Sequence, residues 1–204
     1  VIQVNTDLPI FVDRAIDLGC HEAYPGHHTQ NVLRERDLVG GRGWIEFTLV
    51  PLYGPQSPLE EGGADYGVLL AFPNDERATF ERDVLFPLAG LDPSTAAAYE
   101  QLNELLRELR FAGNEAARDY LDGSITRQEA VDWLFNYGLF STERAEQRLR
   151  FIETYRSYVI NYNVGRDLVK GYVEREAGAD VDRRWSAYTH LYSAPFTAGE
   201  LARP

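Results

Sequence analysis

Cysteine and methionine are almost missing from this chain of 204 residues, which has one cysteine, Cys20, and no methionine. A single cysteine excludes an intrachain disulfide. No apolar stretch approaches the roughly 20 residues that a membrane-spanning helix needs, so we expect no membrane contact. No basic segment followed by an apolar run indicates a signal peptide. Because the chain starts at Val1 and has no methionine, we expect its natural start to lie upstream.

Basic residues are also scarce. The chain has 20 lysines and arginines against 32 aspartates and glutamates, for a net charge of −12, and its only lysine is Lys170. Nucleic acids select basic surfaces, so this charge argues against a nucleic-acid partner. Hydrophobic residues make up 44% and charged residues 25%, which is ordinary for a soluble globular domain. The length predicts one domain over residues 1–204.

Most of the chain has the apolar spacing and capping signals of helices. Ser57, Pro58 and Glu60 fit a capping box with proline at the first helical position, and Thr126 with Glu129 fits another. Weak alternation over 44–50 is compatible with a short strand. The prediction is a mainly α domain with at most a small strand element, and with helices over 11–38, from 58 onward, and over 75–88, 92–121, 127–137, 141–176 and 181–192.

Three of the four histidines lie within eight positions of the stretch CHEAYPGHHTQ, residues 20–30. Histidine is the commonest zinc ligand, and a carboxylate beside a ligand can take a proton from a metal-bound water. Glu22 directly follows His21 and suits this role as a general base. The usual metallopeptidase spacing, His-Glu-x-x-His, is nevertheless missing, because Pro25 stands where the second histidine would be.

The second histidine ligand is either His27 or His28. On an ideal helix His27 lies about 240° round from His21, and His28 lies about 20° off the same face but roughly 10.5 Å further along the axis. Pro25 breaks the helical hydrogen bonding and Gly26 tolerates most backbone angles, so a widened turn could bring His27 back toward His21. A histidine cluster without any metal fits the same residues. Cys20 is either a soft ligand or a small buried residue.

A third ligand could come from the second acidic motif, EEGGADY at residues 60–66. If Glu60 folds back to cap its helix, Glu61 is free to bind a metal. Asp65 lies one turn further on the same face and could hydrogen-bond a ligating histidine. The alternative is that two glutamates in a first helical turn only favour the helix dipole.

Both motifs resemble those of the bacterial proteins grouped as domain of unknown function eight-eight-five, which are similar to gluzincin metallopeptidases. HEAYPGHHTQ resembles the signature HExxPGHxxQ, and EEGGADYGVLL resembles EGWALYxE, with Gly63 and Asp65 in place of the usual tryptophan and leucine. YNVG at 162–165 is loosely similar as well, so the resemblance covers about residues 10–175. It implies a gluzincin-like helical domain with zinc held by His21, His27 and Glu61.

The resemblance also implies a function. It favours His27 over His28, and it suggests that Tyr162 stabilises the oxyanion of a peptide substrate during hydrolysis. Family members are usually more than twice as long as this chain, so we expect an N-terminal half of the parent protein to complete the cleft. Their late histidine-aspartate pair has no counterpart here, since His190 does not fall in register. The alternative function is a non-catalytic domain that binds a metal or a protein on the same scaffold.

Other polar residues have ordinary interpretations. Tyr155, Tyr158 and Tyr162 fall on one face of a helix, which is typical of core packing. Asp13 and Asp17 are either exposed helix charges or carboxylates that support His21. A solvated face is expected for a group of three arginines: Arg144, Arg148 and Arg150.

Overall fold

The computed structural model describes residues 2–7 and 9–203. Every regular element in these residues is a helix or a single helical turn, so the mainly α prediction is confirmed. The longer helices are α2 (His27–Arg34), α3 (Ser57–Ala71), α6 (Ala96–Leu109), α7 (Phe111–Leu121), α8 (Arg127–Gly138), α9 (Thr142–Tyr155), α10 (Asn163–Ala177) and α11 (Val181–Tyr192). In the described ranges no helix is long and apolar enough to cross a membrane.

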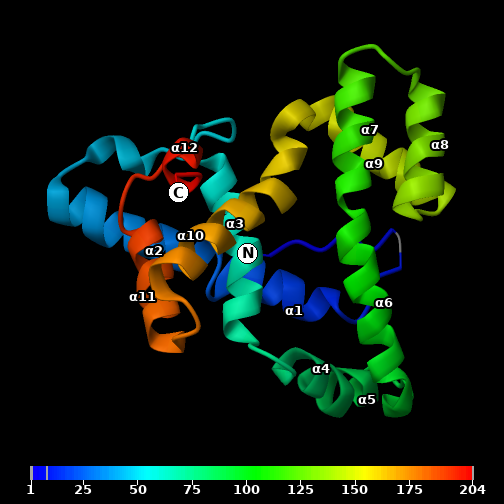
Figure 1. Ribbon diagram of the computed structural model, residues 1–204, viewed down its shortest axis with the longest axis horizontal. Helices are drawn as coiled ribbons and strands as arrows, with labels where there is room; N and C mark the ends of the chain where they lie inside the picture. Colours follow the sequence, from blue (N-terminus) through cyan, green and yellow to red (C-terminus); the bar gives the residue numbers. More distant parts are fainter. Residues whose placement is uncertain (1, 8, 204) are drawn as a thin grey trace.

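Short elements join these helices. They are α1 (Arg14–Leu18), η1 (Gly19–Ala23), η2 (Glu35–Gly40), η3 (Ile45–Thr48), α4 (Glu76–Phe80), η4 (Glu81–Leu85), α5 (Phe86–Leu88), η5 (Pro93–Thr95), η6 (Arg156–Asn161) and α12 (Ala198–Leu201). Figure 1 shows α3 and α10 crossing near the middle of the molecule, with α6 and α7 forming a long column beside them and α8 and α9 next to α7.

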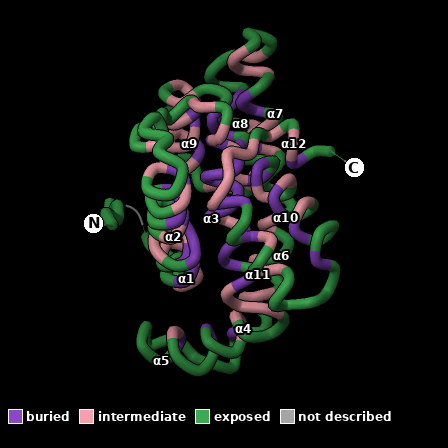
Figure 2. Tube along the Cα trace, turned by 90° about the vertical axis from the view of Figure 1, so that its left-hand side faces the viewer, coloured by how far each residue is buried: buried purple, intermediate pink, exposed green. Residues whose placement is uncertain are grey.

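Two large apolar cores, and a smaller cluster of Ile16, Cys20 and Val68, hold the helices together. One packs α3, α10 and α11 together, around residues such as Tyr66, Val169 and Leu191. The other packs α7, α8 and α9 around Leu134 and Leu149. Figure 2 shows buried positions concentrated on the central helices, while the segment around α5 is mostly exposed. The chain between α9 and α10 therefore joins both cores.

Several local predictions are confirmed. Thr126 and Glu129 form the expected reciprocal capping box at the start of α8. Asp92 accepts a hydrogen bond from the backbone of Ser94, and Ser141 caps α9. The last long helix runs from Val181 to Tyr192, as predicted. In these places the capping residues are close in sequence, so local chemistry decides the boundary.

Other local predictions are wrong. The strand expected over 44–50 is the short 3-10 helix η3, which leaves Ile45 and Leu49 exposed. The described residues contain no second strand with which this segment could pair, and an isolated strand is not stable. The long helix expected over 141–176 is interrupted at Arg156, whose φ is +51°. The helix expected over 92–121 likewise divides at Arg110 into α6 and α7.

The predicted capping box at the start of α3 is also wrong. Ser57 already lies inside the helix, and its hydroxyl donates a hydrogen bond to the backbone oxygen of Leu52 at 2.7 Å. Glu60 instead accepts a hydrogen bond from the guanidinium of Arg34 at 2.6 Å, and both side chains are buried. A distant arginine therefore outcompetes the local cap.

Two glycines allow α3 and α10 to cross closely. A Cβ atom on Gly62 would lie 2.1 Å from the backbone carbon of Gly165. A Cβ atom on Gly165 would lie 2.4 Å from the carbonyl oxygen of Pro58. Real Cβ atoms do not approach the backbone so closely, so only glycine fits at this crossing.

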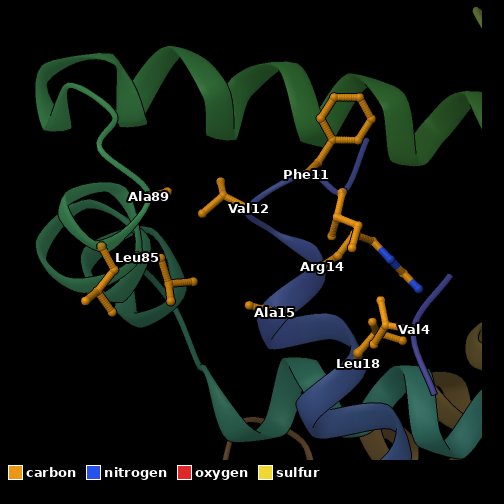
Figure 3. A pocket seen from close by; sticks show the side chains of 10 residues that line it. Val4, Phe11, Val12, Arg14, Ala15, Leu18, Leu85 and Ala89 are labelled. Carbon is orange, nitrogen blue, oxygen red and sulfur yellow. The ribbon is translucent and has the colours of Figure 1, made fainter. Parts of the chain in front are cut away.

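An apolar groove lies apart from this crossing. Figure 3 shows it between the N-terminal segment, α1 and the end of η4, with Phe11, Val12, Leu18 and Leu85 among its lining residues. It contains none of the histidines of the cluster.

The crossing predicts opposite effects for two substitutions in α10. Gly165→Ala should lower the free energy of unfolding by about 1–3 kcal/mol, because its methyl group has no room. Gly171→Ala should raise it by about 0.5–1 kcal/mol, because no atom lies within 4 Å of a Cβ there. Urea denaturation measures both. Equal effects of the two substitutions would contradict the close crossing.

Candidate metal centre

The histidine motif folds as a broken helix. Gly19–Ala23 forms a single π-helical turn, Tyr24 is extended, and a new helix begins at His27. The backbone NH of Gly26 donates a hydrogen bond to the carbonyl oxygen of Cys20 at 2.9 Å. A Cβ atom on Gly26 would stand 1.9 Å from the carbonyl oxygen of His21, so the turn needs glycine at this position. The predicted break at Pro25-Gly26 is therefore present.

This turn brings His27, and not His28, next to His21. The two rings of His21 and His27 meet edge to face, with centroids 4.6 Å apart. His28 is exposed, and its ring packs instead against Tyr24 at 4.9 Å. The second histidine of the pair thus points away from the cluster.

Glu61 on α3 completes a group of three ligands. One carboxylate oxygen, Oε2, lies 3.2 Å from His21 Nε2, and the other, Oε1, lies 3.6 Å from His27 Nε2. One ligand atom from each of the three residues lies within 4.8 Å of the others. Ligands about 2.0–2.2 Å from a tetrahedral ion are themselves about 3.3 Å apart, so this spacing suits a metal ion.

Asp65 fixes the orientation of the His21 ring. Nδ1 of His21 donates a hydrogen bond to Asp65 Oδ1 at 2.8 Å. The proton is then held at Nδ1, and Nε2, which faces Glu61, can present its lone pair to a metal. A carboxylate behind a ligating histidine is the usual partner in metal sites.

The local charges also suit a cation. Burial alone would lower the pKa of His21, but hydrogen bonds and charge from Asp65 and Glu61 raise it to about 9. Burial would raise the pKa of Glu61, but hydrogen bonds from His21, His27 and Tyr158 hold it below its usual range. The pocket therefore holds excess negative charge around one point, which either a proton on His21 or a metal ion can neutralise.

Tyr158 also belongs to this site, although its helical spacing predicted only a core position. Its side chain is buried, and its hydroxyl donates a hydrogen bond to Glu61 Oε1 at 2.7 Å. Burial and the charge of Glu61 both raise its pKa, so it keeps the proton it donates. Its spacing of four residues before Tyr162 was the only sequence signal for this role.

Tyr162 lies between His21 and Phe151 of α9. Its ring stacks against that of His21 with centroids 6.3 Å apart. Burial is the largest cause that raises its pKa, and the charge of Glu61 adds to it. The hydroxyl therefore remains protonated and available as a donor. Glu22, the predicted base, is half-buried and contributes negative charge at Tyr162.

A hydrogen-bonded tyrosine ties the broken turn to α3. The Tyr188 hydroxyl is buried and lies 3.1 Å from the carbonyl oxygen of Pro25 and 2.9 Å from that of Gly63. The single hydroxyl proton is shared between these two carbonyl oxygens, and the Tyr192 hydroxyl, 2.7 Å away, can donate a hydrogen bond to the Tyr188 oxygen. This contact sets the distance between the two motifs that supply the ligands.

The remaining predicted candidates lie outside the site. Cys20 packs against Ile16 and Val68, so it is a small core residue. Asp17 pairs with Arg77 at 2.8 Å, and Asp13 accepts a hydrogen bond from Tyr99 at 2.6 Å, so neither supports His21. His190 is exposed and packs edge to face with Phe196.

The expected solvated face of three arginines is only partly correct. Arg150 is exposed, as expected. Arg144 is half-buried and hydrogen-bonds the carbonyl oxygen of Pro9. Arg148 is half-buried and stacks on Phe151. Helical spacing does not reveal that other segments cover this side of α9.

Comparison of the chain with protein-family models, with curated proteins and with solved structures finds no match.

The geometry predicts different roles for the two adjacent histidines. His27→Ala should weaken metal binding by far more than the 10–100-fold typical of a residue that only supports a ligand. His28→Ala, the matched control, should leave affinity unchanged because its ring lies against Tyr24. Zinc titration with a competing chelator measures both. If His28→Ala is the damaging change, the turn does not bring His27 to the metal.

The two adjacent glutamates should also differ. Glu60→Ala leaves the buried Arg34 unpaired, so it should cost about 3–5 kcal/mol of unfolding free energy while the folded protein still binds metal. Glu61→Ala should abolish metal binding with a smaller loss of metal-free stability, because Asp65 still neutralises His21. Chemical denaturation and zinc titration of both variants test this. If folded Glu60→Ala lost the metal while Glu61→Ala kept it, Glu61 would not be the ligand.

Proposed function

We propose that the chain is a zinc-dependent hydrolase that cleaves peptide bonds with water. The observation that carries this proposal is the convergence of His21, His27 and Glu61 from two motifs far apart in sequence. Two imidazoles and one carboxylate are the ligand set of a known class of catalytic zinc sites, which leaves a fourth position for water or substrate. Imidazole nitrogen suits zinc among the divalent metals, which supports zinc as the ion.

Zinc in this position would supply Lewis acidity, which lowers the pKa of a water molecule and polarises the substrate carbonyl. Glu22 follows the ligand His21 directly and is not itself one of the three ligands. In the proposed reaction its carboxylate accepts a proton from the attacking water and delivers it to the leaving amine. A domain that only binds a metal has no need of such a carboxylate.

Tyr162 has the proposed role of a hydrogen-bond donor to the oxyanion. Its raised pKa keeps the hydroxyl protonated at neutral pH. Its ring lies beside His21, at the edge of the ligand cluster. A donor placed where negative charge develops lowers the barrier to attack on the carbonyl.

The second candidate is a metal-binding domain without catalysis, on the same scaffold. It is favoured by the departure of the second motif from its expected form, at Gly63 and Asp65. Hydrolysis of a non-peptide amide or ester is a third use of the same residues. Either kind of hydrolase needs the Glu22 carboxylate as a base, whereas a domain that only binds a metal does not.

Glu22→Gln is expected to keep zinc and lose peptide hydrolysis by at least 100-fold, since general-base catalysis typically contributes 10²–10⁴-fold. The assay is cleavage of a peptide library followed by mass spectrometry, with zinc content measured on the same sample. Glu35→Gln is the control, because Glu35 is exposed on η2. Equal cleavage by Glu22→Gln and the wild type would exclude Glu22 as the base, and no cleavage by either would favour the binding domain.

A further inference from the structure

Arg148 differs from the other arginines that are buried or half-buried in residues 2–7 and 9–203. Among the described residues seven arginines are buried or half-buried. Arg148 alone among these seven has no carboxylate within 4 Å and no hydrogen bond to a backbone oxygen. The other six each have such a partner: Arg34, Arg77, Arg107, Arg144, Arg166 and Arg184.

Its position in α9 explains why no acid is near. The residues one turn away on the same helix are Arg144, Ala145, Phe151 and Ile152, and none is acidic. A half-buried guanidinium without an anion is costly, because burial removes water that solvates the charge. Burial is the main cause that lowers the pKa of Arg148; Tyr162 opposes this shift, and the positive charge of Arg110 adds to it. In a chain of net charge −12, an unpaired cation of this kind indicates an anion from outside the protein.

Two aromatic rings connect Arg148 to the candidate metal centre. Its guanidinium carbon is 5.1 Å from the centre of the Phe151 ring. The Phe151 ring is 6.3 Å from that of Tyr162, which is 6.3 Å from that of His21. Arg148 also lies against Gly113 of α7. A Cβ atom built on Gly113 would stand 4.0 Å from Nε of Arg148. The guanidinium is thus held in place by packing, while its N–H groups make no hydrogen bond to any residue that the structure describes.

We propose that Arg148 binds a carboxylate group of the peptide substrate and selects for substrates that carry one. This inference rests on the proposed function. The planar guanidinium matches a carboxylate with two parallel hydrogen bonds. An extended peptide covers about 3.3–3.6 Å per residue, so the ring contacts put Arg148 at most about five residues from the ligand His21. The carboxylate is therefore either the C-terminal α-carboxylate or an acidic side chain near the scissile bond.

The test compares random hexapeptide libraries made with a free C-terminal carboxylate or with a C-terminal amide. The zinc-loaded wild type should cleave peptides with a carboxylate within about five residues of the scissile bond about 10–100-fold faster, at equal concentration, than peptides without one. If the α-carboxylate is bound, the preference follows the free acid; if a side chain is bound, it follows aspartate or glutamate in both libraries. No preference for either carboxylate would overturn the proposal.

Arg148→Gln should remove this preference and leave cleavage of uncharged amidated peptides unchanged. Arg148→Lys keeps the positive charge but cannot make two parallel hydrogen bonds to a carboxylate, so it should retain part of the preference. The control Arg150→Gln changes an exposed arginine on the same helix and should retain all of it. Zinc content and the midpoint of thermal unfolding show whether each variant is folded. The proposal would be overturned by a folded Arg148→Gln that keeps the preference. It would also be overturned if Arg148→Gln slowed the cleavage of carboxylate peptides and of uncharged amidated peptides by the same factor.

A measurement of peptide binding without cleavage tests the role of Arg148 independently of the proposed hydrolysis. Zinc-loaded Glu22→Gln is incubated with the same libraries, and retained peptides are identified by mass spectrometry. Enrichment of carboxylate peptides that disappears in Glu22→Gln/Arg148→Gln supports the inference even if the wild type cleaves nothing. Cleavage by the wild type without such enrichment overturns the inference and leaves the proposed function intact.

Discussion

The carboxylate of Glu61 is the point on which the rest of the site depends. It is buried, and it contacts His21, His27 and Tyr158, which come from three different segments. A buried charge costs several kcal/mol unless it is paired, so each segment gains stability by holding its donor against this carboxylate. His21, His27 and Glu61 could also hold a metal ion in place of the proton between His21 and Glu61. The hydrogen bonds from Tyr158 to Glu61 and from His21 to Asp65 would then support the ligands.

This arrangement requires close backbone packing on both sides of α3. On one side the absence of side chains at Gly62 and Gly165 lets α10 approach, which carries η6 and its Tyr158 toward Glu61. On the other side the Tyr188 hydroxyl joins the Pro25 turn to α3. On α9, Arg148 stacks on Phe151, and the Phe151 ring contacts Tyr162 beside His21. Ligands, donor and proposed substrate contact are all held by packed helices.

Much of the fold and of the ligand set could be predicted from local patterns. The capping box of Thr126 and Glu129 and the break at Pro25-Gly26 depend on neighbours in sequence, and both are present. The same kind of pattern failed at Ser57 and Glu60, because Glu60 finds the distant Arg34. Helical periodicity placed Tyr158 on a buried face, but its partner Glu61 lies 97 residues away in sequence. Periodicity identifies a face of a helix; it does not identify what covers that face.

The most direct test of this account is metal analysis of the protein purified without added metal and then titrated with zinc. A metal centre built from His21, His27 and Glu61 should hold one transition-metal ion per chain, either already bound or taken up to that stoichiometry, and His21→Ala should take up none. Protein that contains no metal and takes up none would contradict it, and so would a folded His21→Ala that binds zinc as tightly as the wild type.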